Sequence, residues 1–298
     1  MTDKKKTPTK KPPVNTKKHV IVFDHARVDP SHCLTDGLFR PLKRQSFKGL
    51  SLDVRYKYKE YTFWWRNYCP LNIADQSVFL AVHRLASEKG RVTRVGPKEE
   101  SDLMKSVRDA LELEYQASDQ DVLVLETTQY EISQVMGVTD SGANFKQIKE
   151  SLFRISGVSF VIYKGEDESS AFWKANLIGK MAGIDGKIMI SINPMLSKAL
   201  AGGQSTFVDM REQRHLKGEV SKRLHVWLSS WIKNGESNKI KLDLLVPHVW
   251  GDNCEKAKLR LRRFYLRDAI NEINSLDGWE CFEDKESKFV SIKRPKLQ

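Results

Sequence analysis

The stretch Glu255–Asp277, EKAKLRLRRFYLRDAINEINSLD, decides how the rest of the chain is interpreted. It contains neither proline nor glycine, and its apolar residues return every three or four positions, as on one face of an amphipathic helix. Those residues are Leu259, Leu266, Ile270 and Ile273. Gly278 follows as a typical helix end, so the sequence predicts one long helix over 255–277.

Basic residues crowd the first half of this helix, which is the unfavourable end for them because a helix N-terminus carries partial positive charge. Four cations fall on one stripe at i, i+4, i+7 and i+11, where they repel one another. The stripe consists of Lys256, Arg260, Arg263 and Arg267, with Lys258 and Arg262 beside it. A bound polyanion would remove the conflict, so we expect this face to contact nucleic acid. The alternative is a solvated, charged helix on an ordinary domain.

The segments around this helix follow the order of a winged helix. Residues 242–250 (LDLLVPHVW) predict a short helix and residues 251–253 a turn. Residues 279–283 and 287–293 have the character of two strands joined by a turn. In a winged helix the second helix of such a unit enters the major groove of DNA.

A second unit of the same order lies nearer the N-terminus. Residues 127–136 predict a short helix, with Thr127 or Thr128 as N-cap and Glu131 placed for a capping box. A turn follows, and Asp140 or Ser141 then caps a helix that runs to about residue 156. The alternative is a generic helical pair. The candidate DNA-contacting residues of this helix are Ser141, Asn144, Lys146, Gln147, Lys149 and Arg154.

Strands are predicted after that helix, over residues 158–164, 172–180 and 187–192. The polar stretch 165–170 would then be the tip of a wing. Asparagine and glutamine can recognise adenine in the major groove, and arginine or lysine can recognise guanine. We therefore expect base contacts from four side chains, namely Asn144, Gln147, Arg260 and Arg263.

Taken together, these patterns predict an α+β fold in which a disordered basic N-terminal tail precedes two tandem winged-helix domains. The predicted divisions are a Lys-rich tail over 1–23, an N-terminal arm with the first winged helix over 24–204, and a second winged-helix DNA-binding domain over 205–298. Further helices are expected over 71–89, 99–115, 194–200 and 217–232.

The charge balance favours an acidic polymer as partner, since the net charge is +12 over 298 residues. Half of that excess lies in residues 1–23, which hold seven lysines and one aspartate. This tail is either a nonspecific DNA arm or a solubilising extension. The four cysteines form no CxxC pair, which argues against a zinc site and a disulfide framework and fits a reducing cytoplasm.

Several enzyme classes lack their sequence signatures. The chain has no GxxxxGK[ST] loop for ATP-driven unwinding, no His-x-His pair for metal-assisted nicking, and no GxGxxG or HExxH. We therefore expect no catalytic residues, metal or cofactor. No apolar run is long enough for a membrane span. The group His25, Asp29, His32 and Cys33 matches no standard metal-ligand spacing.

An aromatic band with interleaved lysines runs from Tyr56 to Trp65. Such a band can stack single-stranded bases, which would make the chain an RNA-binding module. More often it is the buried side of a strand with lysines reaching to solvent, and we favour that interpretation.

The segment Ala26–Arg44, ARVDPSHCLTDGLFRPLKR, resembles the N-terminal signature of IncQ-type plasmid replication initiators, the RepC family. Further segments are similar along nearly the whole chain after the tail. They include SGANFKQIKESLFRISGVSF at 141–160, KIMISINPMLSKALAGGQ at 187–204, RLHVWLSSWI at 223–232, HVW at 248–250 and KLRLRRFYLRDAINEINSLDGWE at 258–280. The Lys-rich tail is where this chain departs from the pattern.

The resemblance implies a function at a plasmid origin. Such initiators bind directly repeated duplex sites, called iterons, and open the adjacent AT-rich duplex so that a plasmid-encoded helicase and primase load. Related iteron initiators contain two winged helices, each reading half of a repeat. The active form, monomer or dimer, stays open at this point. The competing interpretations are a repressor that binds an operator without opening it and an enzyme such as a nickase or primase.

Overall fold

The computed structural model describes residues 24–95, 102, 105, 122–165, 172–179, 181–184, 186–192, 205–252, 255–284 and 286–297. Several predictions lie outside these residues. They are the tail over 1–23, the wing tip over 165–170 apart from its first residue, the helix over 194–200, and the helix over 99–115 apart from positions 102 and 105.

Helices occur in both halves of the described chain. They are α1 (Pro30–Leu34), α2 (Ile73–Ala86), α4 (Gln129–Met136), α5 (Gly142–Ser156), α7 (Met210–His215), α8 (Glu219–Trp231), α9 (Leu245–Trp250) and α10 (Lys256–Asn274), with 3-10 turns η1 (Arg44–Phe47) and η3 (Leu242–Leu244). The long basic helix predicted over 255–277 is α10, and it ends three residues earlier than expected.

The strands form small sheets rather than one large sheet. Two have four strands, in the orders β3 (Leu52–Tyr58), β4 (Tyr61–Asn67), β8 (Ser159–Lys164), β9 (Phe172–Asn176), and β10 (Met181–Ile184), β11 (Lys187–Ile192), β7 (Val122–Thr127), β6 (Val92–Val95). A three-stranded sheet has the order β13 (Ser237–Lys241), β15 (Phe289–Lys293), β14 (Glu280–Asp284). Two further pairs occur among the described residues, β1 (His25–Val28) with β12 (Thr206–Asp209) and β2 (Phe39–Arg40) with β5 (Leu71–Asn72).

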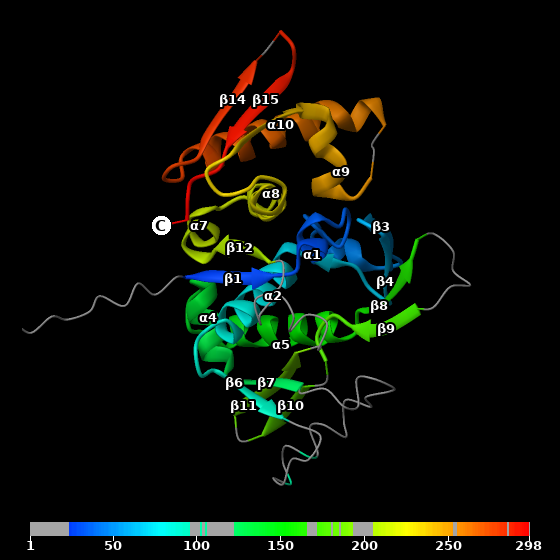
Figure 1. Ribbon diagram of the computed structural model, residues 1–298, viewed down its shortest axis with the longest axis vertical. Helices are drawn as coiled ribbons and strands as arrows, with labels where there is room; N and C mark the ends of the chain where they lie inside the picture. Colours follow the sequence, from blue (N-terminus) through cyan, green and yellow to red (C-terminus); the bar gives the residue numbers. More distant parts are fainter. Residues whose placement is uncertain are drawn as a thin grey trace, which may run out of the picture.

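The described residues form two hydrophobic cores, and Figure 1 shows the helices and strands that enclose them one above the other. The larger core packs α2, α4 and α5 against the strands of the lower half, with Trp65, Phe79 and Leu152 among its buried side chains. The smaller core packs α8, α9 and α10 against the sheet β13-β15-β14, through residues such as Leu228 and Ile270. The aromatic band contributes to the larger core through Trp65, as the sequence favours.

The two halves are joined by contacts that cross the predicted boundary at 204/205. Strand β1 pairs antiparallel with β12, so that His25 lies opposite Asp209. The buried guanidinium of Arg223 donates hydrogen bonds to the carbonyls of Cys33 and Thr35, at 2.8 and 3.0 Å. Neither strand of this pair is among the strands that the sequence predicts.

Local capping follows the predicted chemistry. The hydroxyl of Thr128 accepts a hydrogen bond from the Glu131 amide, and the Glu131 carboxylate accepts one from the Thr128 amide, which completes the capping box of α4. Ser141 is the N-cap of α5. Gly137 ends α4 in the left-handed region, at φ 70°, where a side chain would be strained.

A buried histidine makes the fold sensitive to acid. His83 lies in the core of α2, its Nδ1 bonds the Phe79 carbonyl at 2.9 Å, and burial lowers its pKa to about 4. The unfolded chain therefore binds a proton more readily, and stability falls as pH drops from about 6.5 towards 4. We expect this residue to lower the free energy of unfolding by about 2 kcal/mol at pH 5 relative to neutral pH. In His83→Leu the free energy of unfolding in urea should therefore depend less on pH. The exposed His215→Leu is the control, and an equal flattening there would contradict the assignment.

Candidate nucleic-acid interface

Helix α10 presents one face to the core and the opposite face to solvent. Leu266, Ala269, Ile270 and Ile273 are buried in the smaller core, where α10 packs on α8. The exposed face therefore carries the residues that lie between these positions. The helix begins with no side-chain cap at Glu255 and no acidic residue in its first turn.

Three cations at the start of α10 are exposed, namely Lys256, Lys258 and Arg260. Within the described part of the chain, none of them forms an ion pair or a side-chain hydrogen bond. The unfavourable charge at the helix N-terminus thus remains without an internal counterion at these positions.

The rest of the basic stripe is neutralised inside the chain, which corrects the expectation of four mutually repelling cations. Arg263 donates from Nε and Nη2 to the two carboxylate oxygens of Asp243, both at 2.6 Å. Arg267 holds Glu283 on β14 in the same two-bond manner, at 2.8 Å each. The hydrogen bond from Arg263 lowers the pKa of the Asp243 carboxyl, so the pair stays ionised. The sequence missed these partners because both carboxylates come from other elements.

Arg262 is also held within the chain. Its Nη1 donates to the Asp252 carboxylate at 3.0 Å, and its guanidinium carbon lies 5.0 Å from the centroid of the Trp250 ring. These contacts fix the turn between α9 and α10. Arg262 is therefore a structural residue in this conformation, although the sequence places it among the candidate DNA contacts.

The first two candidates on α5 take part in its capping. The Ser141 hydroxyl accepts a hydrogen bond from the Asn144 amide at 3.3 Å. The Asn144 side-chain nitrogen donates to the Thr139 carbonyl and hydroxyl, at 2.8 and 3.1 Å, and the residue is half-buried. Asn144 thus has its amide donors engaged in the turn before the helix.

The remaining candidates on α5 separate by face. Lys146 and Lys149 are exposed, and Gln147 is half-buried. Arg154 points inward, contrary to the expected exposure, because its guanidinium donates to both oxygens of Asp75, with the shortest distance at 2.7 Å. Asp75 is fully buried. Burial lowers the pKa of Arg154, but the bonds to Asp75 outweigh that effect and leave it raised.

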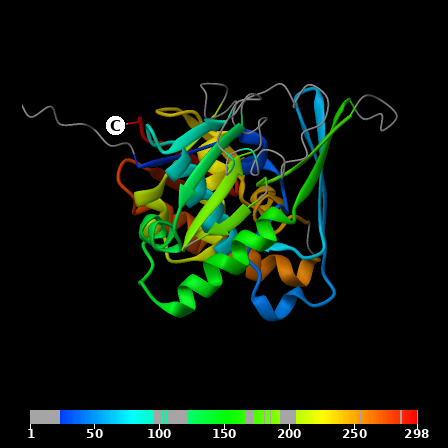
Figure 2. The same ribbon diagram turned by 90° about the horizontal axis from the view of Figure 1, so that it is seen from below.

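Figure 2 shows α5 in green and the start of α10 in orange on the same side of the molecule. The two helices belong to different cores and are separate in Figure 1, with α5 in the lower half and α10 in the upper half. Lys146 and Lys149 on α5, and Lys256, Lys258 and Arg260 on α10, are therefore the predicted residues that solvent, or a ligand, can reach without breaking an internal ion pair.

The exposed lysines should act through phosphate charge. We expect Lys146→Ala and Lys149→Ala each to lower the slope of log affinity against log salt by about 1, with sequence preference unchanged. Fluorescence anisotropy with a labelled duplex at several salt concentrations measures the slope. Lys293→Ala, whose ammonium already pairs with Glu280 at 2.6 Å, is the control and should leave it unchanged.

Sequence reasoning missed a group of apolar side chains on α10. Leu261, Phe264 and Tyr265 are exposed although they lie in the basic half of the helix. The sequence did contain a signal for their exposure, because these three residues fall outside the three-to-four spacing of the buried face.

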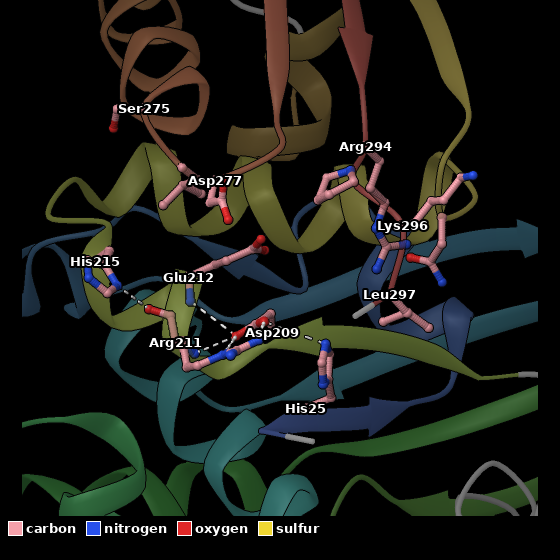
Figure 3. A pocket seen from close by; sticks show the side chains of 13 residues that line it. His25, Asp209, Arg211, Glu212, His215, Ser275, Asp277, Arg294, Lys296 and Leu297 are labelled. Carbon is pink, nitrogen blue, oxygen red and sulfur yellow. Dashed lines mark hydrogen bonds and ion pairs between the residues drawn. The ribbon is translucent and has the colours of Figure 1, made fainter. Parts of the chain in front are cut away.

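A cavity of about 310 Å³ lies where β12 and α7 approach the C-terminal segment. Figure 3 shows Asp209 between Arg211 and His25 at this cavity. Asp209 is the N-cap of α7 and pairs with Arg211 at 2.8 Å, while Glu212 accepts a hydrogen bond from the Trp279 indole at 3.0 Å. The carboxylates of Asp209 and Glu212 at this cavity therefore have structural roles. In the described ranges, no group of three or more His, Cys, Asp or Glu side chains could hold a metal ion.

The arrangement of elements is similar to two solved structures. The crystal structure of selenomethionine derivatives of domains 2 and 3 of RctB has a TM-score of 0.53 and 13% identity, with 90% of this chain and 99% of that chain covered. A second structure of RctB domains 2–3 has a TM-score of 0.50 and 12% identity, with 90% and 97% covered. At these identities the likeness concerns the fold. No curated protein matches the sequence.

No helix in the described part of the chain is long and apolar enough to cross a bilayer. Residues 20–296 match the family described as Replication protein C (RepC), which is nearly the whole chain and includes both candidate helices. The chain therefore belongs to the RepC family of plasmid replication initiators.

Proposed function

We propose that this initiator binds directly repeated duplex sites at its plasmid origin through two winged helices. The observation that carries the proposal is the exposed start of α10, where three cations lack internal partners, at the centre of the unit from α8 to β15. That unit runs helix, strand, helix, helix and hairpin, and β13 closes the hairpin into the sheet β13-β15-β14. This order supports a winged helix whose second helix enters the major groove.

The unit from α2 to β9 supports a second reading element. Helices α2, α4 and α5 pack together in the larger core, and the antiparallel pair β8–β9 follows α5. The β8–β9 hairpin differs from an isolated winged-helix wing because the other edge of β8 pairs with β4. This places α5 beside a four-stranded sheet. Both recognition helices lie on one side of the molecule (Figure 2), which favours a single face of the duplex as their common ligand.

Affinity and specificity come from different residues in this mechanism. Lys146, Lys149, Lys256 and Lys258 contact phosphates, which gives salt-dependent affinity. Gln147 and Arg260 are the best-placed candidates for base edges, since Asn144 and Arg263 are engaged within the chain. Binding at neighbouring repeats bends or twists the intervening DNA and destabilises an AT-rich segment beside it.

Footprinting on the DNA that flanks the gene tests the proposal. The expected result is protection of directly repeated sites spaced for two major grooves about one helical turn apart. Protection of a single palindrome, or none, would overturn the repeat assignment.

Permanganate reactivity separates an initiator that opens DNA from a repressor. Unpaired thymines beside the repeats should become reactive when the protein is added to a supercoiled plasmid. Protection without reactive thymines would favour the repressor, a function that the same fold can also perform.

Loading of a plasmid-encoded helicase and primase follows the opening of the duplex in the proposed order of events, and a helicase recruitment assay on the opened plasmid tests this step. Analytical ultracentrifugation with and without DNA tests whether the active form is a monomer or a dimer.

A further inference from the structure

An apolar ridge runs along the middle of the exposed face of α10. Ala257, Leu261 and Phe264 fall at i, i+4 and i+7, so their side chains line up along one side of the helix. Leu261 is 55% exposed and Phe264 57% exposed. Tyr265 lies beside them at 44% exposure, with its ring 5.8 Å from that of Phe264 in an edge-to-face contact.

Cations flank this ridge on both sides. Arg260 and Lys256 lie along one side of it and Lys258 along the other, by their positions on the helix. All three are exposed. A surface with an apolar centre and a cationic margin fits a ligand whose centre is apolar and whose margins are anionic. The floor and walls of a DNA major groove have that arrangement where thymine methyl groups project into it.

We infer that the ridge reads the 5-methyl groups of thymines in the half-site that α10 contacts. This inference rests on the proposed function and specifies the bases for which α10 is selective. Alanine and phenylalanine are among the side chains that make such apolar contacts with the thymine methyl group. Phosphate contacts from the flanking cations hold the helix in the register that brings Phe264 over the base edge.

A second copy of the chain fits the ridge less well. A two-fold contact through this face would bring Lys256, Lys258 and Arg260 of one copy against the same residues of the other. Like charges facing each other across an interface disfavour the pairing. Duplex DNA removes the charge conflict that a second copy would double.

Deoxyuridine substitution tests the inference, because deoxyuridine lacks only the methyl group of thymidine. The full chain first selects a duplex from a random-sequence library, and each thymidine is then replaced singly. The expected result is a loss of about fourfold in affinity for each contacted methyl, at positions confined to one half-site. In Phe264→Ala the thymidine and deoxyuridine duplexes should bind equally at those positions. Tyr68→Ala is the matched control, since Tyr68 is an aromatic residue that is 75% exposed but lies between β4 and β5, outside both reading units.

The outcomes distinguish the inference from the function beneath it. If no duplex is enriched by selection, the proposed duplex recognition itself fails. If a duplex is enriched but no single replacement lowers affinity, α10 reads no methyl group and the inference is overturned while the function stands. The inference is also overturned if Phe264→Ala binds the thymidine and the deoxyuridine duplex more weakly by the same factor, because the protein then still discriminates between them. A shift from dimer to monomer in Phe264→Ala, without a change in methyl discrimination, assigns the ridge to a second copy instead.

Discussion

Replacing Arg154 with leucine is expected to lower the free energy of unfolding by about 3–5 kcal/mol. The guanidinium of Arg154 is held against the carboxylate of Asp75, which is fully buried at the start of α2. Removing the cation leaves that carboxylate without its counterion in the core, and the remaining bond from the Asn72 amide satisfies only one oxygen. Urea denaturation followed by circular dichroism measures the loss.

Arg267→Leu is the matched control because Arg267 also holds a carboxylate through Nε and Nη2, but its side chain is 48% exposed whereas that of Arg154 is 12% exposed. Exposed pairs contribute about 0–1 kcal/mol, so this variant should be nearly as stable as the parent. Asp75→Asn combined with Arg154→Leu should recover part of the loss, since no isolated charge then remains. Equal costs for the two arginine variants would show that burial does not set the strength of the Arg154 pair.

Replacing Arg260 with alanine is expected to weaken binding to the selected or origin duplex by about 1–3 kcal/mol and to relax preference at one base position. Arg260 is exposed on α10 and has no described internal partner, so its guanidinium can reach a guanine at no cost in broken ion pairs. Anisotropy titrations against matched and mismatched duplexes measure both effects. Its unfolding free energy should stay within about 0.5 kcal/mol of the parent.

Arg263→Ala is the informative comparison. The sequence assigns Arg263 to a base contact, whereas the structure holds its guanidinium on Asp243 through two bonds. We therefore expect a smaller loss of affinity than for Arg260→Ala. The reverse order would mean that Arg263 leaves Asp243 when DNA binds, and the original assignment would then be the better one.

Much of the C-terminal half could be predicted from residue patterns. The spacing of Leu266, Ile270 and Ile273 gave the buried face of α10, and the hairpin after Gly278 is present as β14–β15. The capping box of α4 followed from Thr128 and Glu131 alone. These features are local, since each depends on residues only a few positions apart.

The features that sequence reasoning missed depend on distant partners. Arg154 looks like a surface cation until α2 brings Asp75 against it, and the two are 79 positions apart. Strand β13 is short and carries one buried side chain, Ile240, so its alternation gives little signal. The DNA contacts themselves remain predictions, and the structure narrows them by separating engaged side chains from those that solvent can reach.

Because β12 is synthesised long after β1, the pairing of these two strands is delayed while the chain is being synthesised. His25 meets Asp209, which leaves the ribosome 184 residues later. At about 5–20 residues per second, β1 waits roughly ten to forty seconds for its partner strand. For that interval the nascent chain exposes an open strand edge, and the N-terminal half cannot close before the C-terminal half has begun to emerge.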